Sequence, residues 1–281
     1  MSEHEAMARS ALQRGELERA MQLAARALLE GAPVAQLCWL IDEIAAEASD
    51  PLPLVPLEAG PHTLAFGVAR VRVLFTLGAW TEALALFERL ARFAPVCALF
   101  EVVRVSLVPS VIESVGLTVL QRTVLTLVRV VTSPPALDPE ERRASRARSG
   151  SAILEAMRGV FPDASELYSA ESLLLRRLGD RSGALAVAAL GAARFPDVWS
   201  CLAAMANSLA DSGRAVEAEL FARRALALSP EDGSPLYDLA LGYLNGGAAT
   251  DAVRVLGELL ARFPDYPEAL ERLTEARAMT R

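Results

Sequence analysis

Lysine is absent from this sequence of 281 residues, so all 28 basic side chains are arginine. Without lysine the phosphate-binding loop Gly-x-x-x-x-Gly-Lys cannot occur, and neither Gly-x-Gly-x-x-Gly nor Gly-x-Ser-x-Gly is present. These absences remove the usual sequence signatures of nucleotide-binding and hydrolytic enzymes. We interpret the exclusive use of arginine as the codon bias of a GC-rich, bacterial genome rather than as a set of selected contacts.

Histidine and cysteine are also scarce. The two histidines are His4 and His62, and the three cysteines, Cys38, Cys97 and Cys201, lie far apart in apolar runs. Such cysteines behave as small buried hydrophobic residues, and no spacing typical of a metal site occurs. We therefore expect no metal, no cofactor and no catalytic residues. An active site would then have to consist of a pair of carboxylates, such as Glu101 and Glu113, that meet in a pocket with a third polar group.

The charge and the hydropathy of the sequence further restrict the class of protein and its location. A net charge of −7 argues against nucleic-acid binding. The N-terminus Met1-Ser-Glu-His-Glu has no basic, apolar leader of the signal-peptide type, so we expect a cytoplasmic protein. The uncharged runs in the Val-rich stretch 96–131 are at most eight residues long. A membrane helix needs roughly 18–20 apolar residues, so we expect no membrane span.

A period of 34 residues is the main positive feature. The stretch 165–266 consists of three consecutive segments of that length, closed by Pro196, Pro230 and Pro264. Glycines recur at the same spacing (Gly179, Gly213, Gly247), and so do alanines (Ala184, Ala218, Ala252). A fixed period of this length is typical of stacked helix pairs.

Each repeated residue has a physical role in such a pair. The glycine supplies the left-handed backbone conformation of a sharp turn, and the alanine permits two helices to cross closely. The proline ends the second helix and suits the first turn of the next. We also expect Ser229 to cap the helix that follows it, and Asp265 with Glu268 to cap the last helix reciprocally.

These positions resemble the tetratricopeptide repeat. In segment 233–266 the family's pattern falls on Leu236, Leu239, Ala240, Tyr243, Ala252, Leu256, Leu259 and Pro264. The resemblance implies an all-α, right-handed α-solenoid of about seven antiparallel helix pairs with a C-terminal capping helix.

The chain divides into five stretches on this basis. Residues 1–48 form a repeat-like hairpin plus one further helix, and 49–63 form a Pro-rich strap or linker. We favour a strap, because Leu52, Leu54, Val55 and Leu57 are too apolar for a free linker. Residues 64–164 hold degenerate repeats, 165–266 the three clear repeats, and 267–281 the polar capping helix.

The middle of the chain departs most from the pattern. We read 96–131 as one helix pair whose first helix is shortened or kinked by Pro109. In 132–164 we expect a first helix capped by Asp138, then Gly150, then a second helix over 153–160. Four arginines, at 142, 143, 146 and 148, form either an anion-binding or acidic-partner patch or a solvated helix face.

The resemblance also implies a concave groove lined by the first helix of each pair. In the C-terminal repeats its positions are Arg176, Arg177, Ser200, Asn207, Asp211, Tyr237, Asp238, Leu241 and Asn245. Asn207 and Asn245 are the only asparagines, and an amide can both donate to and accept from a peptide backbone. In the middle repeats the positions are Arg72 and Ser106 together with a mainly apolar set: Phe75, Leu99, Val102 and Val103. We expect that second surface to hold an apolar helix or the chain's own strap.

Two functions remain open at this stage. The first is a scaffold or adaptor that binds a partner protein or peptide in the concave groove and has no chemistry of its own. The second is a regulatory sensor in which a peptide or small ligand shifts the solenoid between two shapes. The sequence does not identify the partner or the oligomeric state.

Overall fold

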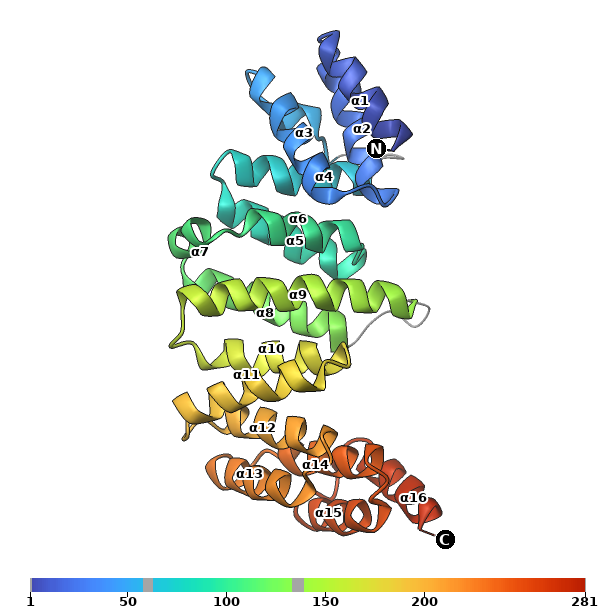
Figure 1. The fold of residues 1–281 in the computed structure, drawn as a ribbon, viewed down its shortest axis with the longest axis vertical. Helices are drawn as coiled ribbons and strands as arrows, with labels where there is room; N and C mark the ends of the chain where they lie inside the picture. Colours follow the sequence, from blue (N-terminus) through green and yellow to red (C-terminus); the bar gives the residue numbers. More distant parts are fainter. Residues whose placement is uncertain (1, 58–62, 133–138, 281) are drawn as a thin grey trace. The chain divides into compact units, whose positions relative to one another are not determined.

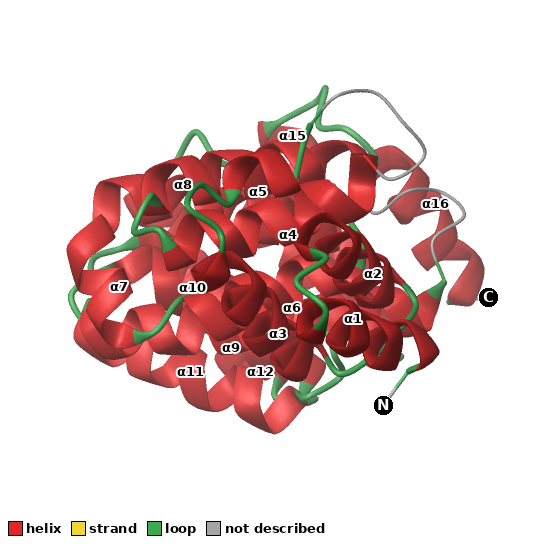
Figure 2. Ribbon diagram, turned by 90° about the horizontal axis from the view of Figure 1, so that it is seen from above, coloured by secondary structure: helices red, strands yellow, loops and turns green. Residues whose placement is uncertain are grey.

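The computed structural model describes residues 2–57, 63–132 and 139–280. All regular elements in these ranges are helices, so the prediction of an all-α fold is confirmed (Figures 1 and 2). The chain consists of two compact units, Met1–Phe161 and Pro162–Arg281, called the N-terminal and C-terminal units below. The handedness of the predicted solenoid stays a prediction.

The C-terminal unit contains three helix pairs and one last helix (Figure 1). Its elements are α10 (Ser165–Arg177), α11 (Arg181–Arg194), α12 (Trp199–Asp211), α13 (Ala215–Leu228), α14 (Ser234–Asn245), α15 (Ala249–Arg262) and α16 (Ala269–Met279). The turn glycines Gly179, Gly213 and Gly247 have φ of 78°, 75° and 77°, a conformation that a β-carbon disfavours. The unit is therefore an array of helix pairs with glycine turns, as the 34-residue period predicts.

Small residues allow the helices of this unit to pack closely. Ala184, Ala218 and Ala252 have no exposed surface. Helices α12 and α14 also approach each other closely. A β-carbon added to Gly242 on α14 would lie only 2.2 Å from the Ala210 Cβ on α12. The predicted role of the alanines at the helix crossings is consistent with this complete burial.

The predicted helix starts in this unit are wrong. Ser229 is the residue directly after the end of α13, and α14 begins only at Ser234, whose N–H donates to the Asp232 carboxylate (2.8 Å). Glu268 precedes α16 with φ of 63°, and no side-chain cap bond forms there. The repeated prolines end the second helices, but two or more turn residues separate them from the next helix.

The N-terminal unit follows the repeat pattern only in part. Its elements are α1 (Glu3–Gln13), α2 (Leu17–Leu29), α3 (Val34–Glu47), η1 (Leu52–Leu54), α4 (Thr63–Thr76), α5 (Trp80–Phe93), α6 (Cys97–Ser106), α7 (Pro109–Val115), α8 (Leu117–Thr132) and α9 (Glu140–Val160). The α1–α2 and α4–α5 hairpins turn at Gly15 and Gly78, both with φ of 74°. These two hairpins match the predicted frame.

The middle of the N-terminal unit differs from the predicted helix pairs. Residues 97–132 form three helices, because Pro109 begins the separate helix α7 rather than kinking α6. Helix α9 runs without a break through Gly150. Gly150 is buried together with two other small residues of α9, Ala147 and Ser151. Gly150 is therefore a buried residue inside a helix and does not form the predicted turn. Asp138, the predicted cap of this helix, lies outside the described residues.

The Pro-rich segment packs against the N-terminal unit as far as the structure describes it. Val55 has no exposed surface, and η1 contacts α2. The Arg70 guanidinium on α4 donates to the carbonyls of Leu52 (3.2 Å) and Val55 (3.0 Å). Residues 52–55 therefore form a strap. Pro61 and His62 lie outside the described residues.

Among the described helices, none is long and apolar enough by itself to cross a membrane. Helices α7 and α8 together reach that length and composition, but they are bent by 110° at the break between them.

Candidate functional site

Helices α10, α12 and α14 form one face of the C-terminal unit, which we call the first-helix face. Each of these helices contacts the next, whereas α11, α13 and α15 pack mainly on the first helices and make at most marginal contact with one another. Close spacing on one side and wide spacing on the other curve a stack toward the closely spaced side. The first-helix face is therefore the concave side of this unit, as the repeat resemblance implies.

An ion pair joins the first two helices of this face. The Arg176 Nε on α10 lies 2.7 Å from the Asp211 Oδ2 on α12, and both side chains are about four-fifths buried (20% and 16% exposed). A pair at this depth is screened less by water than a surface pair. It holds the end of α12 against α10 and fixes the positions of both charges.

A second polar contact joins α12 to α14. The Asn207 Nδ2 donates to the Asp238 Oδ2 at 2.8 Å. Asn207 is only 6% exposed, and its Oδ1 accepts no hydrogen bond in the described structure. Asn207 therefore holds the Asp238 carboxylate in place, and its role as a contact to a partner stays a prediction.

Asp238 on α14 is a charged group of the first-helix face that makes no ion pair in the described part of the chain. It is half-buried, and its one direct partner among the described residues is the neutral Asn207 amide. Burial raises the pKa of Asp238, although the Asn207 hydrogen bond and the nearby charges of Arg176 and Arg177 lower it in part. A half-buried carboxylate with free lone pairs is an acceptor for a backbone N–H or a basic group of a partner.

Aromatic residues border Asp238 on the side of α16. The rings of Tyr237 and Tyr266 lie 5.2 Å apart, and the Tyr237 hydroxyl donates to the Glu268 carboxylate at 3.0 Å. Burial raises the pKa of Tyr266 to about 12, with Asp238 and Asp232 adding to the effect. Both phenols are therefore neutral at physiological pH and offer apolar surface beside the carboxylate.

The remaining predicted groove residues take different positions. Arg177 is exposed and makes no ion pair in the described part of the chain, while Ser200 and Leu241 are half-buried. The side chain of Asn245 lies outside what the structure describes. Sequence reasoning missed Tyr266 and Glu268, because they precede α16 and so do not belong to any first helix of the repeats.

The predicted apolar groove of the N-terminal unit is not an open surface. Leu99, Val102 and Val103 have no exposed surface and Phe75 is 6% exposed, because α6 is covered by α3, α4 and α9. These four residues are core, so the expectation that they line a groove is corrected.

A polar cluster instead joins the helices at this place in the N-terminal unit. The Arg72 Nε donates to Asp42 (2.9 Å), and the Arg72 Nη1 donates to the Ser106 hydroxyl (2.8 Å). Thr76 also donates to Asp42 at 2.8 Å. The cluster ties α3, α4 and α6 together, and the resemblance did not identify Asp42.

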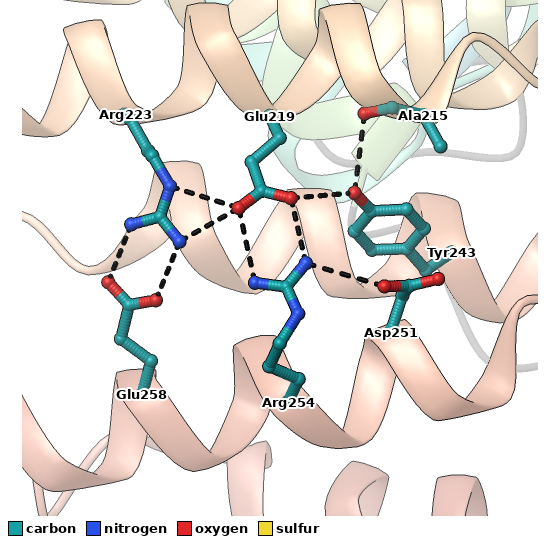
Figure 3. Close-up of polar contacts among 7 residues, drawn as sticks. All are labelled: Ala215, Glu219, Arg223, Tyr243, Asp251, Arg254 and Glu258. Carbon is teal, nitrogen blue, oxygen red and sulfur yellow. Dashed lines mark hydrogen bonds and ion pairs between the residues drawn. The ribbon is translucent and has the colours of Figure 1, made fainter.

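The opposite side of the C-terminal unit carries a different polar network (Figure 3). Glu219 on α13 accepts from Arg254 on α15 at 2.7 Å, from Arg223 at 2.8 Å and from the Tyr243 hydroxyl at 3.1 Å. Arg223 also reaches Glu258 on α15. Long arginine and glutamate side chains thus span the wider gap between the second helices. Every charge of this network has a partner, which is typical of a structural rather than a binding role.

The predicted catalytic pair does not assemble. The Glu101 carboxylate on α6 is bound by Arg104 and Ser149, whereas Glu113 is exposed on α7, and no polar contact joins the two. The described residues contain no group of three His, Cys, Asp or Glu side chains suited to a metal ion. Burial raises the pKa of Cys38 to about 12 and that of Cys201 to about 11, so both are thiols at neutral pH.

Comparison with known proteins finds similar chains among the solved structures. No protein-family model and no curated protein matches the chain. One similar solved structure is the APC/C hetero-tetramer Cut9–Hcn1, with 14% identity, a TM-score of 0.41, and coverage of 92% of this chain and 55% of that one. This chain thus spans about half the length of that protein.

A second similar structure is the assembly chaperone of RpL4, Acl4 (residues 1–338). It has 20% identity, a TM-score of 0.35, and coverage of 98% of this chain and 95% of that one. Such low identities and TM-scores say nothing about what this chain binds.

Proposed function

We propose that the chain is a scaffold or adaptor that binds an extended segment of a partner protein on its first-helix face. The observation that supports this most is Asp238, a half-buried carboxylate whose one direct partner among the described residues is a neutral amide. Burying a charge in this way destabilises a protein unless the charge gains a partner. A bound peptide supplies that partner through a backbone N–H or a basic side chain.

The other residues of the face have distinct roles in this proposal. Arg177, which is exposed and unpaired in the described structure, donates to carbonyls or acidic groups of the partner. Tyr237 and Leu241 provide apolar contact, and Ser200 lies on the same face at the start of α12. Arg176, Asp211 and Asn207 position the binding groups through the contacts between helices. Asn245 stays a predicted contact.

The nature of the partner follows from charge and shape. The chain carries a net charge of −7, which disfavours a nucleic acid and leaves a protein or peptide. The face presents one carboxylate and one arginine to a partner, which suits the alternating donors and acceptors of an extended backbone. A bacterial origin and a cytoplasmic location stay predictions from the sequence.

The proposal is tested by selecting random displayed peptides on the full chain and measuring their affinity for variants. Asp238→Asn and Arg177→Ala should each weaken a selected peptide about tenfold, the equivalent of about 1.4 kcal/mol. The matched control is Arg262→Ala, which removes another exposed arginine that has no ion pair in the described structure but belongs to α15. Peptides that bind all four proteins equally would place the site elsewhere.

A further inference from the structure

Acidic and aromatic side chains gather around Asp238 in the first half of α14. The Asp238 carboxylate is half-buried and forms no ion pair in the described part of the chain. It accepts one hydrogen bond there, from the Asn207 Nδ2 at 2.8 Å. A carboxylate has room for several donors, so its other lone pairs are open to a ligand. The groups around Asp238 decide whether that ligand is neutral or charged.

A second acceptor without a donor lies next to this carboxylate. Asn207 is 6% exposed, and its amide points at Asp238 across the contact between α12 and α14. The Asn207 Oδ1 is buried and accepts no hydrogen bond from the described residues. A buried acceptor without a donor destabilises a folded chain. This part of the face therefore has two acceptors, one of them charged, and lacks donors.

Two further carboxylates add negative charge near Asp238. Asp232 accepts a backbone N–H at 2.8 Å, and Glu268 accepts the Tyr237 hydroxyl at 3.0 Å. Neither contact brings a positive charge. Burial is the main cause that raises the pKa of Tyr266, and Asp238, Asp232 and Glu268 add to it, which places all three acids near this ring.

The arginines near these acids are mostly engaged elsewhere. Arg176 pairs with Asp211 at 2.7 Å, and the Arg272 Nη1 beside Tyr237 lies 2.7 Å from a Glu275 carboxylate oxygen. Arg177 forms no ion pair with any of the three acids in the described structure. Three carboxylates without an ion pair thus lie near one arginine without an ion pair. The balance of unpaired charge favours a cation.

Two aromatic rings favour a cation with an extended stem. The rings of Tyr237 and Tyr266 are half-buried, lie 5.2 Å apart and are tilted by 36° to each other. The face of a tyrosine ring attracts a guanidinium or an ammonium group, and it also covers the methylene groups of an arginine or lysine side chain. A backbone N–H would satisfy one lone pair of Asp238 but would neither neutralise the charge nor use the rings.

We propose that the partner segment places an arginine or lysine side chain at Asp238, an assignment that rests on the proposed peptide binding to the first-helix face. The cationic head pairs with the Asp238 carboxylate and supplies a donor to the Asn207 Oδ1. The stem of the side chain lies along the rings of Tyr237 and Tyr266. Asp238 then determines specificity, because it selects peptides with a basic residue at one position.

The test uses the full chain and peptides selected on it from a random displayed library. A selected peptide is synthesised in two forms, one with its basic residue and one with citrulline in place of arginine or acetyl-lysine in place of lysine. The second form keeps the size and removes the charge. Calorimetric titration of both forms with the wild type and with Asp238→Asn completes a double-mutant cycle. The wild type should bind the neutral form about tenfold more weakly, whereas Asp238→Asn should bind the two forms within about twofold.

Asp251→Asn is the matched control, because it removes an exposed aspartate of α15, and it should keep the tenfold preference. Selected peptides without a basic residue, or an equal loss on neutralisation in the wild type and in Asp238→Asn, would overturn the proposal. If Asp238→Asn and Arg177→Ala still weakened those peptides, the proposed peptide binding would stand, with a backbone N–H at Asp238. Peptides that bind both of these variants like the wild type would contradict the proposed function as well.

Discussion

At the scale of single residues, the chain shows two kinds of charged side chain. Glu219 has three hydrogen-bonding neighbours that hold its pKa at about 2, chiefly through the Arg254 hydrogen bond. Asp238 has one neutral partner and a pKa raised chiefly by burial. The contacts of Glu219 stabilise the folded chain. Asp238 is a destabilising group on a concave face, and groups with a shifted pKa are common at binding sites.

Replacing Asp238 by asparagine should therefore not destabilise the protein. Because the pKa of Asp238 is raised in the folded chain, its ionised form opposes folding above that pKa, and this effect disappears as the pH falls below it. We expect Asp238→Asn to change the free energy of unfolding at pH 7 by less than about 1 kcal/mol, in the stabilising direction. Urea denaturation at pH 7 and at pH 3 measures it. A clear loss of stability at pH 7 would show that Arg176 and Arg177 already compensate the charge.

Ala218 tests the packing of the repeat at the same scale. It has no exposed surface, and an arginine there would place a long charged side chain inside a closed helix crossing. We expect Ala218→Arg to cost about 3 kcal/mol or more, measured by thermal denaturation. Ala227→Arg on the exposed side of the same helix is the control and should change stability little. Equal melting temperatures for the two variants would contradict the observed packing.

At the scale of elements, successive helices are held together differently on the two sides of the C-terminal unit. On the concave side, small residues such as Ala210 and Gly242 bring α12 and α14 into direct contact. On the other side, Arg223 and Arg254 bridge from one second helix to the next through Glu219 and Glu258 (Figure 3). The wider gap explains why long charged side chains serve there.

Glu219→Gln should weaken this connection in a pH-dependent way. The folded pKa of about 2 lies below the ordinary 4.5, so the stabilisation is present above pH 4.5 and is lost as the pH falls toward 2. We expect a cost of about 1–2 kcal/mol at pH 7 that vanishes near pH 2, measured by urea denaturation across this range. Glu258→Gln, which removes contacts to Arg223 alone, should cost less. A cost for Glu219→Gln that does not change with pH would exclude the ionised carboxylate as its cause.

At the scale of the whole molecule, the sequence predicts the C-terminal unit better than the N-terminal one. Gly179 and Ala184, with their copies 34 residues apart, are required by the backbone of a turn and by a helix crossing, so their period identifies the pairs directly. In the stretch 97–132, the Val, Leu and Thr residues are compatible with helices of several different lengths. Pro109 and Gly116 then decide where helices begin and end, and the repeat frame does not contain that information.

The candidate site, like the fold, was predicted from the sequence only in part. The repeat frame places Arg176, Asp211, Asn207 and Asp238 on first helices, and the structure joins them in two pairs. It does not indicate which residue is buried, and the structure shows that Asn207 is 6% exposed and donates to Asp238. Tyr266 and Asp42, a partner of Arg72, lie outside the predicted groove positions, and their contacts depend on packing that periodicity does not describe.

Site-specific photocrosslinking tests most directly whether a partner binds on the first-helix face. A benzophenone amino acid replaces Arg177 in one full-length variant and Arg262 in another, both exposed positions on the C-terminal unit. After irradiation in a lysate of the native cells, we predict covalent adducts with a protein partner from position 177 and none of these from position 262. Adducts from position 262 alone, or the same adducts from both positions, would contradict the claim.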